Sequence, residues 1–207
     1  MGKLIYGRKA SLVTGFMFDQ KDKFIQSQIL GMTIQGAFQH IKIYRKDAEK
    51  IDNDDKAAFR ENVRTYLSDF ENEYTSRVAS NRHIANIERL LAKINGLHTS
   101  ILKDGGISFG VAQKLLNLYL KYDWCLGRIE EPPHCPIDAM ILEAVGMNKS
   151  PWSPWSQMSG EQYNEIIDAI EKTRGGQSIA DWELDEWKKA IRAGVEKSVA
   201  HHKGKDL

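Results

Sequence analysis

A lysine and an aspartate stand out among the residues whose side chains could do chemistry. Lys114 lies in GVAQKLLNLYLKY (residues 110–122), where apolar residues recur at helical spacing, so its amine falls on what should be a buried helix. Burial favours the neutral form of a lysine, and a neutral amine is a nucleophile. The alternative is an ordinary surface lysine whose stem snorkels past its neighbours, with Lys121 as another example seven residues later.

The turn before Lys114 is a candidate anion site. DGGISFG (residues 104–110) joins two expected helices and contains three glycines, which permit tight backbone geometry. Unpaired N–H groups at the start of the following helix can bind an anion such as a phosphate. Many joints between helices share this composition, so an ordinary turn remains the alternative.

Asp138 stands at the start of another expected helix. It follows Pro136 and Ile137 and leads into a short apolar segment that ends at Gly146. An aspartate in this position commonly caps the helix and favours its positive N-terminal end. Lys114 and Asp138 belong to different elements, so only the fold could bring their side chains together.

The elements that must position these residues are helices nearly throughout. Apolar residues recur at steps of three and four, which predicts an all-α fold. The predicted helices cover residues 19–46, 51–74, 80 to about 103, 110–122, 137–146, 160–174 and 179–199. Ser159 and Gln162 form a capping-box pattern before the sixth helix. EEPPHCP and SPWSPWSQ are predicted loops because of their prolines, and KLIY (residues 3–6) is a weak strand signal.

Gly110, Lys114 and Asp138 belong to motifs that together resemble the helix-hairpin-helix DNA glycosylase superfamily, in its lysine-bearing, 8-oxoguanine glycosylase-like branch. Its members carry a hairpin of the form G-V-G-x-K, followed by an aspartate in a P-V-D context. This chain has GVAQK at 110–114 and PID at 136–138, with a lysine-to-aspartate separation of 24 (138 minus 114). Ala112 stands where the second hairpin glycine is usual. The detailed match covers about residues 104–146.

The resemblance implies an architecture and a set of roles. Residues 1–207 would form a single two-lobed helical domain, with the helix-hairpin-helix motif near 85–122 and the aspartate loop near 130–146. Lys114 would attack the anomeric carbon of a sugar to form a Schiff base, while Asp138 stabilises positive charge on the sugar and relays protons. The residues expected to bind DNA phosphates are Gly106, Gly110, Ala112 and Gln113.

An enzyme of this kind must flip its target nucleotide out of the duplex and hold the base in a pocket, often against aromatic rings. Trp152 and Trp155 lie on a predicted loop, and Trp152 is taken as the pocket candidate. His134 and Cys135 shortly precede Asp138 and could line the same site, although a structural role in the proline turn is favoured. Oxidised purines, alkylated bases and the modified bases of foreign DNA all fit such a pocket.

Composition argues against several cofactors and settings. The two cysteines, Cys125 and Cys135, are too few for the four-cysteine iron–sulfur cluster of some relatives and match zinc-ligand spacing poorly. We therefore predict free thiols, no metal and no cofactor. There is no apolar run near about 18 residues and no signal-peptide pattern, so we expect a cytoplasmic protein without a membrane segment. We also expect a monomer.

The charge distribution leaves a nucleic-acid partner open. Net charge is only +1, yet residues 78–128 carry 7 basic and 3 acidic side chains, whereas residues 129–187 carry 3 and 12. A local basic patch is sufficient to bind phosphates. The predicted function is a DNA glycosylase with AP lyase activity, acting on DNA with a damaged or modified base. The alternatives are a non-catalytic helix-hairpin-helix DNA-binding module, in which Lys114 only contacts phosphate, and a helical interaction protein.

Overall fold

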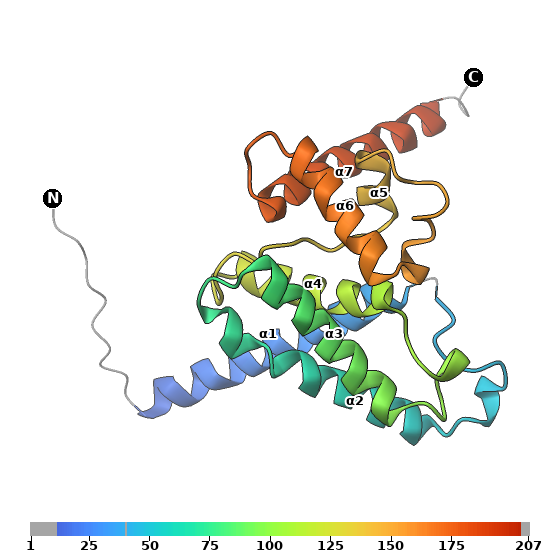
Figure 1. The fold of residues 1–207 in the computed structure, drawn as a ribbon. Helices are drawn as coiled ribbons and strands as arrows, with labels where there is room; N and C mark the ends of the chain where they lie inside the picture. Colours follow the sequence, from blue (N-terminus) through green and yellow to red (C-terminus); the bar gives the residue numbers. More distant parts are fainter. Residues whose placement is uncertain (1–11, 40, 204–207) are drawn as a thin grey trace, which may run out of the picture.

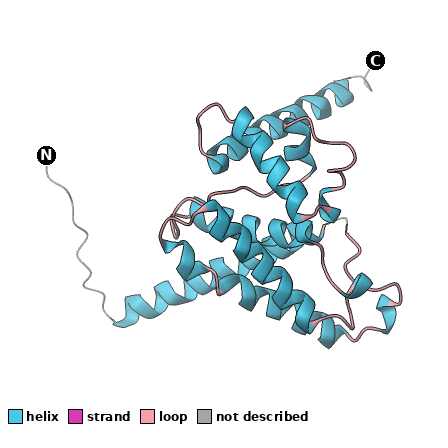
Figure 2. Cartoon of the chain, in the orientation of Figure 1, coloured by secondary structure: helices cyan, strands magenta, loops and turns pink. Residues whose placement is uncertain are grey.

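The chain is mainly helical in this computed structural model, which describes residues 12–39 and 41–203. Side chains are described for residues 20–39, 41–47 and 49–193. Figure 2 shows helices and loops over this part of the chain and no strand, so the all-α prediction is confirmed. The predicted strand at residues 3–6 lies outside it. The α-helices are α1 (Leu12–Phe38), α2 (Asn53–Ser68), α3 (Ser80–Leu97), α4 (Phe109–Cys125), α5 (Ala139–Ala144), α6 (Gly160–Thr173) and α7 (Ile179–Lys203). Short 3-10 helices are η1 (Ala48–Lys50), η2 (Glu71–Thr75), η3 (Lys103–Gly105) and η4 (Trp155–Gln157).

The helices fall into two groups, α1 to α4 and α5 to α7, as Figure 1 shows. Helix α4 lies centrally, because it contacts α1, α2, α3 and α6. It is therefore buried around most of its circumference, which explains why apolar residues occupy more than one of its faces. Its wholly or almost wholly buried apolar side chains include Val111, Leu115, Leu116 and Leu120. In the second group α5 packs against α7.

Helices α1 and α3 both end earlier than their apolar periodicity predicts. The segments that follow them, residues 43–45 and 101–103, run antiparallel and form an isolated bridge between Tyr44 and Leu102. Backbone hydrogen bonds of 3.1 and 2.8 Å flank this bridge. Hydrogen bonds between these two distant segments thus replace helical hydrogen bonds. The apolar pattern within either segment does not predict this pairing.

Helix starts agree with the capping residues in the sequence. Asp52 caps α2 by accepting a hydrogen bond of 2.9 Å from the Asp54 amide. Ser159 and Gln162 form both bonds of the predicted capping box at α6. The second helix is shorter than predicted, because η2 takes up the end of the segment expected to be helical through residue 74.

Candidate functional site

Lys114 and Asp138 meet in the folded chain. Lys114 lies on α4 and its Nζ is 2.5 Å from Oδ2 of Asp138, the residue just before α5. The Lys114 side chain is 8% exposed and that of Asp138 is 30% exposed. The structure therefore makes Lys114 a buried member of an ion pair, not an ordinary surface lysine.

The Asp138 carboxylate has a different partner on each oxygen. Oδ1 accepts hydrogen bonds from the amides of Met140 at 3.0 Å and Ile141 at 3.3 Å, so Asp138 caps α5. Oδ2 faces Lys114. The capping role predicted from the sequence is confirmed, and the cap orients the other carboxylate oxygen toward the lysine.

Gln113 holds the segment before Asp138 against α4. Its Nε2 donates to the carbonyl oxygen of Ile137 at 2.7 Å, and its Oε1 accepts from the Ile137 amide at 3.1 Å. The Gln113 side chain is completely buried. In this conformation it is therefore not free to contact a DNA phosphate, and it positions Ile137, the residue next to Asp138.

The amides of Gly110 and Ala112, also expected to bind phosphate, already have partners inside the protein. Gly110 N donates to the Met158 carbonyl and Ala112 N to the Ser108 carbonyl, both at 3.1 Å. A Cβ added to Gly110 would lie 2.1 Å from the carbonyl oxygen of Trp155. Glycine is needed here because η4 packs against the helix backbone, so neither amide is free to bind a phosphate in this conformation.

Of the four residues expected to bind phosphate, Gly106 alone lines a cavity of about 580 Å³ beside the turn, which we call the turn cavity. Asn95 of α3 anchors the turn, because its amide group exchanges hydrogen bonds of 2.8 and 3.0 Å with the backbone of Ile107. The lining also includes Val111, one helical turn before Lys114, and Ser156. The turn cavity therefore reaches close to the ion pair, although neither Lys114 nor Asp138 lines it.

The tryptophan beside the ion pair is Trp155. Lys114 Nζ lies 5.7 Å from the centre of a Trp155 ring, a distance compatible with a cation–π contact. Trp152, the predicted pocket residue, instead donates from Nε1 to Glu165 on α6 at 2.6 Å. The repeated SPW pattern does not distinguish the two rings. The packing of η4 against α4 distinguishes them, because it places Trp155 next to Lys114.

His134, another predicted pocket residue, is buried between α3 and α6. Its Nε2 lies 2.7 Å from Ser80 Oγ and its Nδ1 lies 2.9 Å from the Tyr163 hydroxyl. Burial lowers the pKa of His134 to about 4, so the ring is neutral near neutral pH. His134 lines a cavity of about 460 Å³ that includes neither Lys114 nor Asp138. It therefore does not share a pocket with the ion pair.

The hydrogen bonds around His134 continue to Gln113. Asn117 donates at 3.1 Å to Gln113 Oε1 and at 3.2 Å to the Tyr163 hydroxyl. The Tyr163 hydroxyl therefore connects Asn117 to His134, and His134 in turn contacts Ser80. The network gives structural support to the side chain that holds the Asp138 segment.

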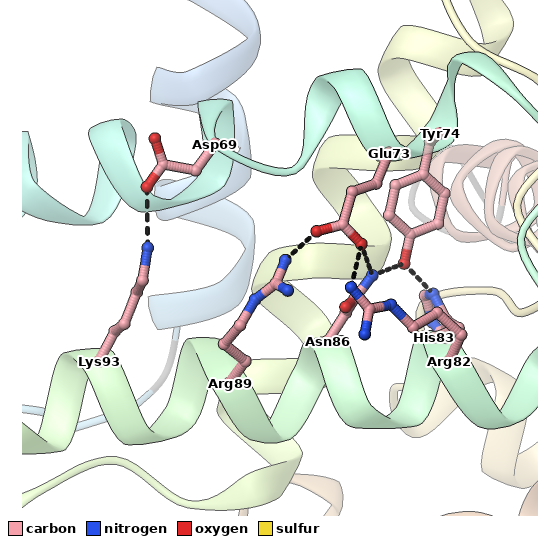
Figure 3. Close-up of polar contacts among 8 residues, drawn as sticks. All are labelled: Asp69, Glu73, Tyr74, Arg82, His83, Asn86, Arg89 and Lys93. Atoms are coloured by element: carbon pink, nitrogen blue, oxygen red, sulfur yellow. Dashed lines mark hydrogen bonds and ion pairs between the residues drawn. The ribbon is translucent and has the colours of Figure 1, made fainter.

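A second polar cluster fixes α3 to η2, as Figure 3 shows. The Tyr74 hydroxyl lies 2.7 Å from His83 Nδ1 and accepts from Asn86 at 3.1 Å. The Glu73 carboxylate accepts from Arg89 and from two further residues of α3. The His83 ring lies 4.9 Å from the His134 ring, so the two polar networks are adjacent in the core.

Lys121 forms a second buried ion pair two helical turns beyond Lys114. Its Nζ is 2.6 Å from Glu183 Oε2 of α7, with the side chains 15% and 5% exposed. The surface position given to Lys121 as an alternative is therefore wrong. Burial raises the pKa of Glu183, and Lys121 opposes that rise. Cys135 is wholly buried near both pairs, and burial raises the pKa of its thiol, so it belongs to the core.

No family model, curated protein or solved structure matches this chain. A functional assignment therefore depends on the geometry of its own residues. Over the described part of the chain, no cluster of three or more His, Cys, Asp or Glu side chains could hold a metal ion. Cys125 and Cys135 are both free. None of the described helices combines the length and the apolar character needed to cross a membrane.

Proposed function

We propose that this chain is a DNA glycosylase that removes a damaged or modified base and cleaves the resulting abasic site through a Schiff base on Lys114. The observation that carries the proposal is the buried contact of 2.5 Å between Lys114 Nζ and Asp138 Oδ2. It joins the two residues that the resemblance to helix-hairpin-helix glycosylases assigns to catalysis. The short distance allows a proton to pass directly between amine and carboxylate.

The chemistry needs a neutral Lys114. Its amine attacks the anomeric carbon, a carbon–nitrogen bond forms, and the bond to the base breaks with its electron pair leaving on the base, which solvent protonates. Asp138 takes the proton lost by the amine. Asp138 then returns that proton to the ring oxygen as the sugar opens to a protonated Schiff base. The intermediate then loses a C2′ proton to solvent, a C2′–C3′ double bond forms, and the 3′ phosphate leaves with the electron pair of its C3′–O bond, which cuts the strand.

Trp155 supports the proposal through its position beside the lysine. Its ring lies beside Lys114 Nζ and next to the turn cavity, whose lining includes the neighbouring Ser156. A base extruded from the duplex needs an aromatic or apolar surface to replace its stacking partners. Trp155 offers that surface adjacent to the nucleophile.

The test is borohydride trapping with duplexes that carry an oxidised purine, an alkylated base or an abasic site. We expect wild type to form a covalent complex with at least one duplex, and Lys114→Gln to form none. Lys114→Arg is the second variant, because arginine can keep the ion pair but stays protonated and cannot form the Schiff base. Lys172→Gln, an exposed lysine of α6, is the matched control and should trap like wild type.

Asp138→Asn separates the two roles of the aspartate. The asparagine side-chain oxygen can still accept from the amides of Met140 and Ile141, so the cap of α5 persists while the charge beside Lys114 is lost. We expect the trapping rate to fall by about 100-fold or more, the usual contribution of a positioned acid–base group. A rate equal to that of wild type would remove Asp138 from the mechanism.

A non-catalytic DNA-binding module is the second candidate, in which the buried ion pair of Lys114 and Asp138 is purely structural. In that case Lys114 stabilises the fold and performs no chemistry. Wild type would bind DNA yet yield no covalent complex from any duplex in the panel. Lys114→Arg would then retain DNA affinity as well as folding.

A further inference from the structure

A group of exposed cations lies beside the turn cavity and plays no part in the Lys114 chemistry. We call it the basic surface, and it consists of Lys42, Arg45, Lys46, Arg60 and Lys103. A second cavity, of about 610 Å³, adjoins the turn cavity, and the two share Lys42 and Lys103 in their linings. The two linings together contain these five cations and one carboxylate, that of Asp104. The hollow is therefore strongly positive although the whole chain is nearly neutral.

The backbone holds these cations in place. They come from three separate parts of the chain, namely residues 42–46, α2 and the start of η3. The bridge between Tyr44 and Leu102 joins the first part to the third, with Lys103 N donating to the Ile43 carbonyl at 2.8 Å. The tertiary fold thus brings these cations together, because they belong to segments that are separate in the sequence.

Most of these charges are available to a partner. Arg45 pairs with Asp47 at 3.0 Å, and Lys103 makes only a long contact of 3.7 Å with Asp104. Lys42, Lys46 and Arg60 make no ion pair with any residue that the structure describes. All five side chains are exposed, so no single small anion would be enclosed by them. Exposed, dispersed cations fit a partner that supplies many phosphates, each held weakly by charge.

We propose that the basic surface binds the sugar–phosphate backbone of nucleic acid beside the turn cavity. The proposal extends the proposed function, because it supplies phosphate contacts that the buried amides of Gly110 and Ala112 cannot supply. It does not require Lys114 to be catalytic. A strand that follows the basic surface passes the turn cavity toward Val111 and Ser156, next to the ion pair.

The test is a titration of fluorescent duplex DNA with the full chain at several salt concentrations. The triple variant Lys42→Gln, Lys46→Gln, Arg60→Gln should bind more weakly and lower the slope of log Kobs against log salt by about two to three, at roughly 0.9 per lost phosphate contact. The matched control removes three exposed cations on the other helix group, in Lys172→Gln, Lys188→Gln, Arg192→Gln, and should keep the wild-type slope. Circular dichroism checks that both triple variants fold.

Equal slopes for the two triple variants, or no DNA binding by wild type at low salt, would overturn the basic-surface proposal. Binding to vesicles of phosphatidylserine and phosphatidylcholine, but not to DNA, would also overturn it and assign the surface to membranes. Borohydride trapping is read separately. A wild type that binds DNA with the expected slope but is never trapped refutes the lysine chemistry and leaves the basic surface in place.

Discussion

At the scale of single residues, His134 makes stability depend on pH. Burial lowers its pKa from 6.5 to about 4 in the folded chain, while the unfolded chain keeps the ordinary value. Between these values the unfolded state binds a proton that the folded state does not. The contribution of neutral His134 to the free energy of unfolding is therefore complete above about pH 6.5, and it is lost as pH falls toward about 4.

We expect the free energy of unfolding to decrease by about 3 kcal/mol across that window from His134 alone, at about 1.4 kcal/mol per pKa unit. His83 acts in the same direction, because burial lowers its pKa too. Urea unfolding followed across the window measures the effect. His134→Gln, which keeps a polar side chain that can both donate and accept hydrogen bonds but does not titrate, should reduce the pH dependence. An unchanged dependence in this variant would show that the residue is not responsible.

At the scale of elements, the contact between α4 and η4 depends on a missing side chain. Gly110 lies so close to the Trp155 carbonyl that an added Cβ would come within 2.1 Å of it. Backbone atoms on both sides cannot move independently of their helices, so η4 must shift as a unit. Since η4 carries Trp155, such a shift would also alter the surroundings of Lys114.

Gly110→Ala should therefore destabilise the fold by about 1–3 kcal/mol, the usual cost of overpacking, and should lower any trapping by Lys114. Gly31→Ala in α1 is the control, since an added Cβ there meets nothing within 4 Å. It should stabilise the helix by up to about 1 kcal/mol, because alanine is a better helix former than glycine. Chemical denaturation of both variants gives the comparison, and similar effects on stability would contradict the packing explanation.

At the scale of the whole molecule, the buried pair Lys121–Glu183 links α4 to α7 and thus joins the two helix groups. Removing only one partner leaves a buried charge without compensation, whereas removing both does not. Lys121→Met should cost about 3 kcal/mol, and Lys121→Met combined with Glu183→Met should recover most of that loss. Denaturant unfolding of the single and double variants measures the coupling.

The exposed pair Lys188–Asp185 is the control for this comparison of single and double variants. Its side chains are 60% and 42% exposed, so water screens the charges and the coupling should stay below about 1 kcal/mol. If the loss of unfolding free energy in the double variant equalled the sum of the losses in the Lys121 and Glu183 single variants, the two buried charges would not stabilise each other.

The sequence by itself determined the helical class of this protein and many helix starts. Helix formation depends on apolar periodicity and on capping bonds between residues two or three positions apart, which explains why Ser159 and Gln162 predicted the start of α6 correctly. Asp138 was also recognisable as a cap from its neighbours alone. These interactions are local, so a single stretch of sequence contains all the groups involved.

The tertiary structure alone decided which side chains meet. It paired Lys114 with Asp138, ended α1 and α3 early through the Tyr44–Leu102 bridge, and placed Trp155 beside the lysine. The resemblance suggested the first of these contacts, but the bridge and the choice of tryptophan have no local signal. Each depends on packing between segments far apart in the chain, and packing selects among residues of the same type by position, which composition and spacing do not encode.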